Sequence, residues 1–236
     1  MALEHEIRAN HLRPAAELAE RVLLPGDPAR ALAVAQALLE APPRMFNHAR
    51  GLWGYTGTAA DGELLTVQAT GMGGPSAAIV CEELIALGAK RLVRIGTCGA
   101  LDSSLELGTL IAAERVIPDD GASAALGADG ALEPDPTLLA RLVEAGARPA
   151  AVATSDLFYD PREGHSDELA ARGAAVIEME AATVFQVAAR RGVAAACVLG
   201  VSDVAAGDGT RRMSDAELRE LGVRIGEAGY AALRSR

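Results

Sequence analysis

The sequence predicts an α/β fold built on a doubly wound or closed, mostly parallel sheet. Strand-like and helix-like segments alternate along the chain, which is the order typical of α/β folds. The chain has 236 residues and 50% of them are hydrophobic, enough to bury one substantial core. A division into two halves would separate the motifs described below, so we expect one domain spanning residues 1–236.

The expected elements follow from hydrophobic periodicity and from capping residues. Apolar or alternating runs predict strands at 21–24, 55–59, 63–70, 91–97, 109–118, 150–155, 176–179 and 197–201. Helical spacing predicts helices at 28–39, 76–87, 136–145, 180–191 and 214–233. Ser214 and Glu217 have the spacing of a capping box at the start of the last helix. The stretch 119–136 is rich in alanine, glycine and aspartate and is expected to be an exposed loop.

The charge and the cysteines exclude several classes of protein. A formal net charge of −10 opposes binding to the phosphate backbone of nucleic acids. Cys81, Cys98 and Cys197 lie in apolar or turn segments without the spacing of metal ligands, so we expect reduced thiols in a cytoplasmic protein and no metal site. No apolar run is long enough to span a membrane, and the first residues do not form a targeting signal.

The most informative local pattern is the turn after the first expected strand. Asp27 and Pro28 suit the N-cap and the first position of a helix, and Gly26 lets a ligand approach the backbone donors at that helix start. Arg30 would add a two-pronged hydrogen bond to phosphate. These residues favour an anion site; the alternative is an ordinary turn with a solvated arginine.

A second expected strand carries Arg94 in its interior and Thr97 at its end. Alternation places Arg94 and Leu92 on one face of this strand and Val93 and Ile95 on the other. Because strands of α/β folds are covered on both faces, Arg94 is expected to be buried and to need an anion. That anion is either a bound phosphate or an aspartate or glutamate of the chain.

Acidic residues follow two further strands. Glu178 and Glu180 flank Met179 where a strand runs into a helix, and a carboxylate there can grip the neighbouring hydroxyls of a ribose. The alternative is a carboxylate that caps the helix. Ser202 and Asp203 end the next strand, at the edge where ligands bind in open α/β sheets. Asp203 is therefore a candidate general acid, and a loop-capping role is its alternative.

Seven short motifs are spread over nearly the whole chain. They are PGDPAR (25–30), NHARGLWGYTG (47–57), GMGGPS (71–76), RIGTCG (94–99), SDLFY (155–159), EMEA (178–181) and SD (202–203). Their order and spacing resemble the nucleoside phosphorylase-I family, which contains the hexameric bacterial purine nucleoside phosphorylases and uridine phosphorylases. The resemblance implies a central mixed, twisted sheet, partly closed into a barrel and flanked by helices.

The resemblance also implies roles for individual residues. The ligands of phosphate would be Gly26, Arg30, Arg94, Thr97 and, from a neighbouring subunit, Arg50. The ligands of the ribose would be Met179, Glu180 and His5. The base would contact Phe158, Glu178, Ser202 and Asp203, with Asp203 as the catalytic acid.

Two positions depart from the family's pattern. Glu6 stands where a histidine that reaches the ribose 5′ hydroxyl is expected, so His5 is assigned to that role with His11 as the alternative. The purine-specific members also carry an arginine on the last helix that helps the catalytic acid to release its proton. The candidates for it in this chain are Arg211, Arg212 and Arg219.

The implied activity is reversible phosphorolysis of purine ribonucleosides or deoxyribonucleosides to the free base and the pentose 1-phosphate. Inorganic phosphate would be a co-substrate, and no cofactor would take part. The expected partners are nucleoside, phosphate and further copies of the chain, in a hexamer of three dimers with shared sites, and neither nucleic acid nor a membrane. The alternatives are a uridine phosphorylase, a nucleosidase that hydrolyses methylthioadenosine or adenosylhomocysteine, and a non-catalytic nucleoside-binding protein.

Overall fold

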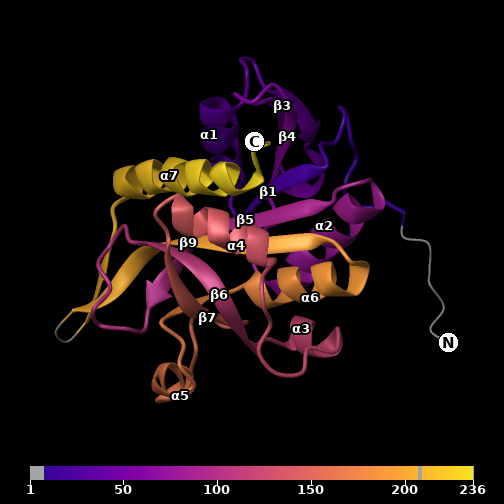
Figure 1. Cartoon of the computed structure of the whole chain (residues 1–236). Helices are drawn as coiled ribbons and strands as arrows, with labels where there is room; N and C mark the ends of the chain where they lie inside the picture. Colours follow the sequence, from indigo (N-terminus) through magenta and orange to yellow (C-terminus); the bar gives the residue numbers. More distant parts are fainter. Residues whose placement is uncertain (1–7, 207–208, 236) are drawn as a thin grey trace.

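A ten-stranded mixed sheet organises the computed structural model, which describes residues 8–206 and 209–235 (Figure 1). The strands are β1 (Arg21–Pro25), β2 (Arg44–Asn47), β3 (Gly54–Thr58), β4 (Leu64–Gln68), β5 (Arg91–Ala100), β6 (Leu110–Asp119), β7 (Arg148–Ser155), β8 (Val176–Glu178), β9 (Ala194–Ala206) and β10 (Gly209–Arg212). Their order across the sheet is β10-β9-β6-β7-β8-β5-β1-β4-β3-β2.

Five of these strands close into a barrel. β9 pairs antiparallel with β6 through its middle and parallel with β5 over most of its length. β7 joins β6 to β8, and β8 joins β5, which completes the ring. The expected mixed and partly closed sheet is therefore confirmed. The barrel brings the carboxyl ends of β5 and β9 together, and β1 lies parallel beside β5.

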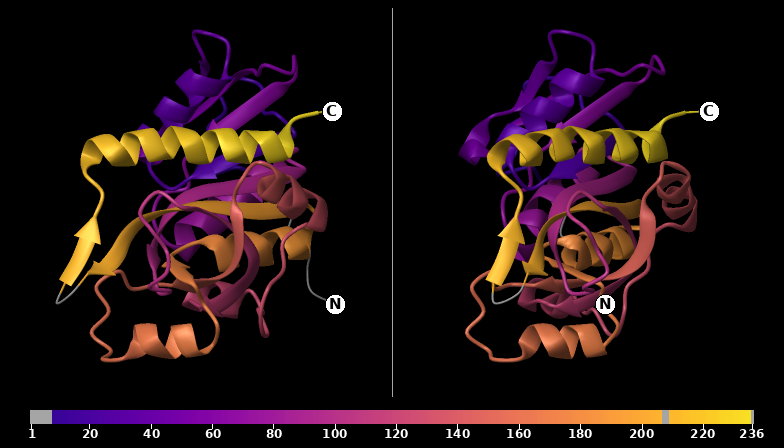
Figure 2. Two further views of the ribbon diagram at one scale, coloured as in Figure 1. Left: turned by 60° about the vertical axis from the view of Figure 1, so that its left-hand side comes forward. Right: turned by 90° about the vertical axis from the view of Figure 1, so that its left-hand side faces the viewer.

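Seven α-helices and one short 3-10 helix surround the sheet in the described part of the chain. They are α1 (Pro28–Leu38), η1 (Ala49–Gly51), α2 (Gly74–Ala86), α3 (Gly121–Ala125), α4 (Pro136–Glu144), α5 (His165–Ala171), α6 (Ala181–Arg191) and α7 (Asp215–Leu233). Figure 2 shows α7 crossing the middle of the molecule, with α1 on one side of it and α5 at the opposite end. α1, α4 and α7 bury their apolar residues in one cluster, and α2 and α6 bury theirs in another.

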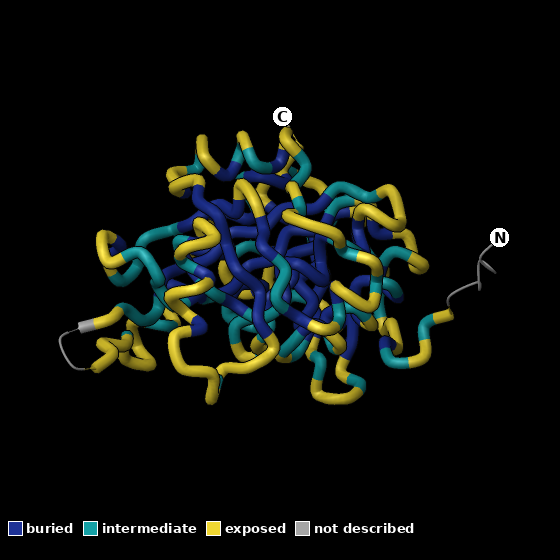
Figure 3. The backbone as a smooth tube through the Cα atoms, turned by 90° about the horizontal axis from the view of Figure 1, so that it is seen from below, coloured by how far each residue is buried: buried dark blue, intermediate teal, exposed yellow. Residues whose placement is uncertain are grey.

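The two hydrophobic clusters lie on opposite faces of β5. Leu92 belongs to the cluster under α2 and α6, whereas Val93 and Ile95 belong to the cluster under α7, which confirms the predicted alternation. α7 approaches the sheet closely, because a Cβ on Gly229 would lie 2.7 Å from Ile95 and 2.9 Å from Leu23. The middle of the sheet is consequently buried, and Figure 3 shows buried segments at the centre of the molecule with exposed segments around and over them.

Each expected strand and each expected helix is present, with ends shifted by a few residues. Asp27 caps α1 by accepting from the backbone N–H of Ala29, and the capping box of Ser214 and Glu217 opens α7. The prediction of an exposed loop at 119–136 is wrong in its first third, where α3 forms and Asp120 is buried as its cap. The sequence also did not predict β2, β10, η1 or α5, each of seven residues or fewer.

A buried ion pair holds the end of α7 against the start of β1. Arg21 is 2% exposed and its guanidinium makes a two-pronged contact with Asp61, with Nη2 2.6 Å from Oδ1. Arg21 also donates to the carbonyl of Leu64 and lies 5.6 Å from the ring centre of Tyr230. The hydrogen bond from Arg21 lowers the pKa of Asp61 well below its usual 3.8, against the opposing effect of burial.

Replacing Asp61 should therefore destabilise the protein. Asp61→Ala leaves a buried guanidinium unpaired, which we expect to lower the free energy of unfolding by about 3 to 5 kcal/mol at pH 7. Since the pKa of Asp61 is depressed on folding, the pair stabilises fully above about pH 4 and its contribution is lost as the pH falls through the folded pKa. Chemical denaturation at pH 7 and pH 3 measures both effects. The exposed Asp129→Ala is the control, and an equal loss in both variants would contradict the prediction.

Candidate active site

The carboxyl ends of β1, β5 and β9 bring the predicted site residues together. Leu24 pairs with Arg94 in the parallel ladder of β1 and β5, so Gly26 and the start of α1 lie just beyond this pair. Thr97 and Gly99 of β5 pair with Gly200 and Asp203 of β9. Three sequence motifs more than 60 residues apart therefore meet at one edge of the barrel.

Arg94 lies at the centre of this edge and is 4% exposed. Its Nε is 2.7 Å from Glu178 Oε2, and its Nη2 is 2.5 Å from Glu180 Oε2. A Cβ on Gly96 would lie 2.7 Å from Nη2, so only glycine leaves room for the guanidinium there. Burial acts to lower the pKa of Arg94, but Glu180 and Glu178 outweigh it and raise the pKa. The ion pair with an internal acid, one of the two alternatives for Arg94, is thus present.

One nitrogen of Arg94 takes part in none of these contacts. Nη1 is buried and has no hydrogen-bond partner in the part of the chain that the structure describes. Leaving a buried guanidinium N–H unsatisfied is costly, which favours a bound acceptor at this nitrogen. Burial raises the pKa of the neighbouring Cys98 and Cys197 thiols, so neither supplies a thiolate as that acceptor.

Glu178 uses both carboxylate oxygens within the protein. It accepts from the backbone N–H groups of Glu180 and Ala181 at 2.9 to 3.0 Å, from the hydroxyl of Thr154 at 2.5 Å, and from Arg94. Its side chain is 1% exposed. These contacts correspond to the helix-capping alternative for Glu178, at the start of α6. The predicted contact of Glu178 with a base stays a prediction, and the geometry offers no open oxygen for it.

Glu180 occupies the N-cap position of α6 and faces the site. Its Oε1 accepts from the backbone N–H of Gly73 at 2.5 Å, and its Oε2 pairs with Arg94. Burial raises the pKa of Glu180, although Arg94 opposes this shift. Met179 lies half-buried between the two glutamates. The carboxylate is held rigidly from two sides, as a group that positions a sugar hydroxyl must be.

Arg30 projects from the first turn of α1 toward the same region. In residues 8–206 and 209–235 no hydrogen bond or ion pair of Arg30 is present. Burial and the nearby charge of Arg94 lower the pKa of Arg30, while Asp27 and Glu180 oppose this shift. Two guanidinium groups that lie close together repel each other, and such a pair is typical of a site that binds an anion. The prediction of an anion site beside Gly26 and Arg30 is consistent with this geometry.

Asp203 and Ser202 lie near the end of β9, on the base side of the expected site. The Ser202 hydroxyl is 2.9 Å from Asp203 Oδ1 and also donates to the carbonyl of Cys98. A Cβ on Gly99 would lie 2.7 Å from Asp203 Oδ2, so glycine is required for Asp203 to occupy this place. The carboxylate is held by β5 and by its neighbour in the chain.

The hairpin of β9 and β10 places an arginine beside Asp203. Arg212 is the residue of β10 that pairs with Asp203, and its guanidinium carbon lies 5.2 Å from the ring centre of Phe158. Arg211 pairs with Val204, and Arg219 lies on α7. Of the three candidate arginines, Arg212 is therefore the one that the structure brings to Asp203. Periodicity could not identify it, because the four residues of β10 do not form a recognisable strand pattern.

Arg50, a predicted ligand, stands apart from this cluster. Arg50 lies in η1 with a φ of 58°, a left-handed conformation that is unusual for a residue with a side chain, and it is exposed. Asn47 fixes the turn by donating to the carbonyl of Leu52 at 2.5 Å and accepting from the N–H of Ala49 at 3.3 Å. His5 lies outside the described residues.

Metal and membrane features are lacking in the described ranges. No group of three or more histidine, cysteine, aspartate or glutamate side chains is arranged to hold a metal ion there. None of the helices in those ranges combines the length and the apolar character needed to cross a membrane. All three cysteines are buried and free.

Comparison with known proteins identifies the family. Residues 20–234 match the Phosphorylase superfamily, and the chain belongs to it. The purine nucleoside phosphorylase DeoD-type of Oceanobacillus iheyensis is 40% identical over 197 residues, covering 79% of this chain and 83% of that protein. Those of Geobacillus kaustophilus and Bacillus cereus are 39% and 38% identical over 196 residues, 79% of this chain and 82% and 83% of theirs. The sequence-based resemblance is confirmed.

Proposed function

We propose that this protein is a purine nucleoside phosphorylase, a pentosyltransferase that converts a purine nucleoside and inorganic phosphate into the free base and a pentose 1-phosphate. Its similarity to proteins that bear this name supports the purine substrate. The observation that carries the phosphorolytic step is the half-buried Arg30 near the buried Arg94, because together they hold unused donors beside a fixed glutamate. No cofactor takes part in the proposed reaction.

Phosphate binds in this proposal between Arg30 and the free Nη1 of Arg94. The backbone donors at Gly26 and the hydroxyl of Thr97 complete its ligands from β1 and β5. Guanidinium groups and helix-start N–H groups are the donors that suit a phosphate dianion. Glu180 repels that dianion, so its carboxylate binds the ribose hydroxyls instead, with Met179 against the sugar ring.

The chemistry requires each developing charge to meet a fixed partner. As the glycosidic bond lengthens, positive charge grows on the sugar and negative charge on the base. The phosphate dianion stabilises the sugar and then forms the new bond to its anomeric carbon. Asp203 gives its proton to the departing base, and Arg212 stabilises the carboxylate that remains. Phe158 and Ser202 border the base.

The catalytic unit in this proposal is an oligomer that shares its sites. Arg50 is exposed on a strained turn, and Met45 and Trp53 beside it are 39% and 42% exposed. A charged group with an apolar surround is typical of an interface. Arg50 reaches the phosphate site of a neighbouring copy, and three such dimers form a hexamer. His5 serves the ribose 5′ hydroxyl, and the protein acts in the cytoplasm.

One assay separates the candidate activities. Inosine, adenosine, methylthioadenosine and uridine are each incubated with the protein, with and without phosphate. Release of purine only with phosphate supports the proposal. Release of base without phosphate indicates a nucleosidase, cleavage of uridine indicates a uridine phosphorylase, and binding without turnover indicates a binding protein.

The residues after Tyr159 favour the purine enzyme, since Asp160–Glu163 lacks the glutamine and arginine pair of uridine phosphorylases.

Removal of Arg30 should weaken the use of phosphate selectively. Arg30→Ala deletes charge-assisted hydrogen bonds to a dianion and leaves every carboxylate with its partner. Arg94→Ala, in contrast, would leave Glu178 and Glu180 without their charged partner. We expect kcat/KM for phosphate to fall about 30- to 1000-fold, equivalent to about 2 to 4 kcal/mol. Steady-state kinetics with phosphate varied at saturating inosine measures this. An unchanged phosphate dependence would place the anion elsewhere.

Removal of the acid should depend on the leaving group. Asp203→Asn cannot donate a proton, so we expect turnover of inosine to fall about 10²- to 10⁴-fold. The base of 7-methylguanosine leaves without protonation, and its turnover should be nearly unaffected. Rates for both substrates with each enzyme test this. Equal losses would show that Asp203 only positions the base.

Shared sites should allow two inactive variants to complement each other. Arg30→Ala and Arg50→Ala each lose one phosphate ligand, but a mixed dimer contains one site with both arginines. Co-expression should restore up to about one quarter of the wild-type activity, because half of randomly paired dimers are mixed and each has one intact site. Activity no greater than the sum of the separate variants would contradict an Arg50 contributed by the neighbour.

A further inference from the structure

The loop 156–164 between β7 and α5 carries Phe158 but has little apolar anchoring of its own. Leu157, Phe158 and Tyr159 are 49%, 56% and 89% exposed, and the rings of Phe158 and Tyr159 meet edge to face with their centres 5.0 Å apart. Side chains that are this exposed contribute little packing energy to hold a loop in one conformation. The position of Phe158 must therefore depend on the polar contacts at the ends of the loop.

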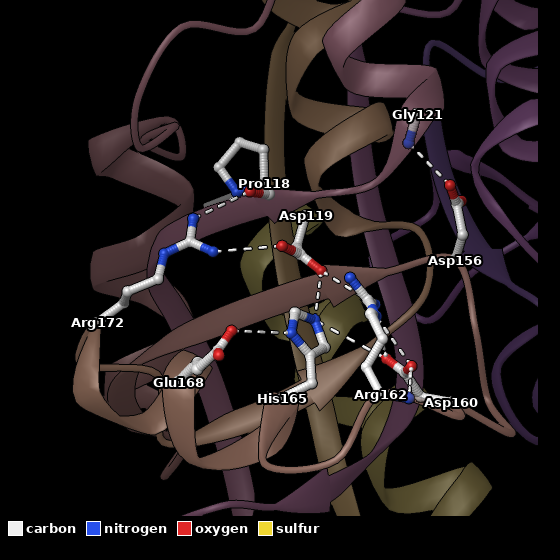
Figure 4. Close-up of polar contacts among 9 residues, drawn as sticks. All are labelled: Pro118, Asp119, Gly121, Asp156, Asp160, Arg162, His165, Glu168 and Arg172. Carbon is white, nitrogen blue, oxygen red and sulfur yellow. Dashed lines mark hydrogen bonds and ion pairs between the residues drawn. The ribbon is translucent and has the colours of Figure 1, made fainter.

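The first end of the loop is tied to the start of α3. Asp156 Oδ2 accepts from the backbone N–H of Gly121 at 2.8 Å (Figure 4). Asp120 separates Gly121 from the end of β6; it is 5% exposed and accepts from the hydroxyl of Thr183 of α6. This end of the loop is thus attached to a rigid part of the fold.

The second end is tied to the last residue of β6 through a single carboxylate. Asp119 Oδ2 lies 2.7 Å from Nε2 of His165, which is 8% exposed at the start of α5, and 3.6 Å from Arg162. Asp119 Oδ1 lies 3.3 Å from Nη1 of Arg172, which follows α5. Figure 4 shows these three side chains converging on Asp119. One side chain therefore fixes both ends of α5.

A second acid closes the loop on itself. Asp160 accepts from the backbone N–H of Arg162 at 2.9 Å and from its Nη2 at 2.6 Å, and these bonds lower the pKa of Asp160 to about 2. Asp160 Oδ2 is also 3.9 Å from His165 Nε2, and Glu168 Oε2 is 3.5 Å from His165 Nδ1. The contacts of Asp160 and Glu168 stay within the loop and α5. Asp119 connects this cluster to the sheet through its side chain, and the carbonyl of Pro118, also in β6, adds one contact by accepting from Nη2 of Arg172 at 3.1 Å.

We propose that Asp119 is a positioning residue for base binding: through His165, Arg162 and Arg172 it holds the 156–164 loop so that Phe158 lies against the base beside Asp203. This inference rests on the proposed function. Asp119 itself does not touch the base, because its carboxylate is occupied by these three side chains. Arg212, which lies over Phe158, contacts the loop from the other side. A loop held from both sides presents an ordered aromatic surface to the base.

The test separates binding of the base from binding of phosphate. Asp119→Asn keeps the shape but removes the charge, so we expect KM for inosine to rise about 5- to 30-fold while kcat and KM for phosphate stay within about twofold. Binding of hypoxanthine, measured by calorimetry, should weaken by the same factor. Asp135→Asn is the matched control, because Asp135 caps α4 beside Ala195, at the end of β9 remote from Asp203.

Two further variants decide whether the effect passes through the loop. His165→Gln removes the partner, and in a double-mutant cycle Asp119→Asn should add little to it. In a Phe158→Ala background, Asp119→Asn should leave KM for inosine unchanged, because the group it positions is gone. A full additional penalty in that background would overturn the proposal, as would unchanged hypoxanthine binding in Asp119→Asn. Unfolding of both Asp119→Asn and His165→Gln below the assay temperature would assign Asp119 a structural role instead.

These outcomes are independent of the reaction class. Wild-type protein that releases purine only with phosphate supports the proposed function, whatever Asp119→Asn does. If the wild-type enzyme is active and the variants match it, the positioning role alone is wrong. If the wild-type protein does not release purine, the proposed function fails, and with it the inference that rests on it.

Discussion

A buried guanidinium between two buried carboxylates is the interaction on which the site depends. Arg94 on β5 pairs with Glu178 and Glu180, which belong to β8 and to the start of α6, so the ion pairs fasten the barrel wall to the helix behind it. Such groups cost several kcal/mol each to desolvate and are stable only together. The same geometry leaves Nη1 of Arg94 unused. The arrangement that stabilises the barrel wall through these ion pairs therefore also leaves a donor for an anion.

The site has two regions: a rigid floor, and a rim that is held in place by polar contacts. The floor consists of barrel strands in which Arg94 is buried and fixed by Glu178 and Glu180, and the missing side chains of Gly96 and Gly99 leave space for Arg94 and Asp203. The rim consists of the loop with Phe158 and of β10, where exposed side chains are held by ion pairs and a cation–π contact. The floor suits phosphate transfer, which needs charges in fixed positions. The rim suits the base, which must enter and leave the site.

β9 connects these regions. β9 has thirteen residues, which pair with β5 and β6 in the barrel wall and then continue past the barrel to pair with β10. Asp203 lies at the point where β9 leaves the barrel. Its neighbours on the two sides are Gly99 of the wall and Arg212 of the hairpin. One strand therefore sets both the position of the acid and the position of the arginine beside it.

The sequence by itself determined the order of the elements, the helix caps at Asp27 and Ser214, and the residue types that gather at the site, because periodicity, capping and turn chemistry are local. It also indicated that Arg94 would be buried, but left open which anion would meet it. Only the tertiary structure decided that choice, by bringing Glu178 and Glu180 from more than 80 residues away. The short elements α3, α5, β2 and β10 were missed for the same reason. Their stability comes from contacts with distant residues, such as Asp119 with His165, and not from their own propensities.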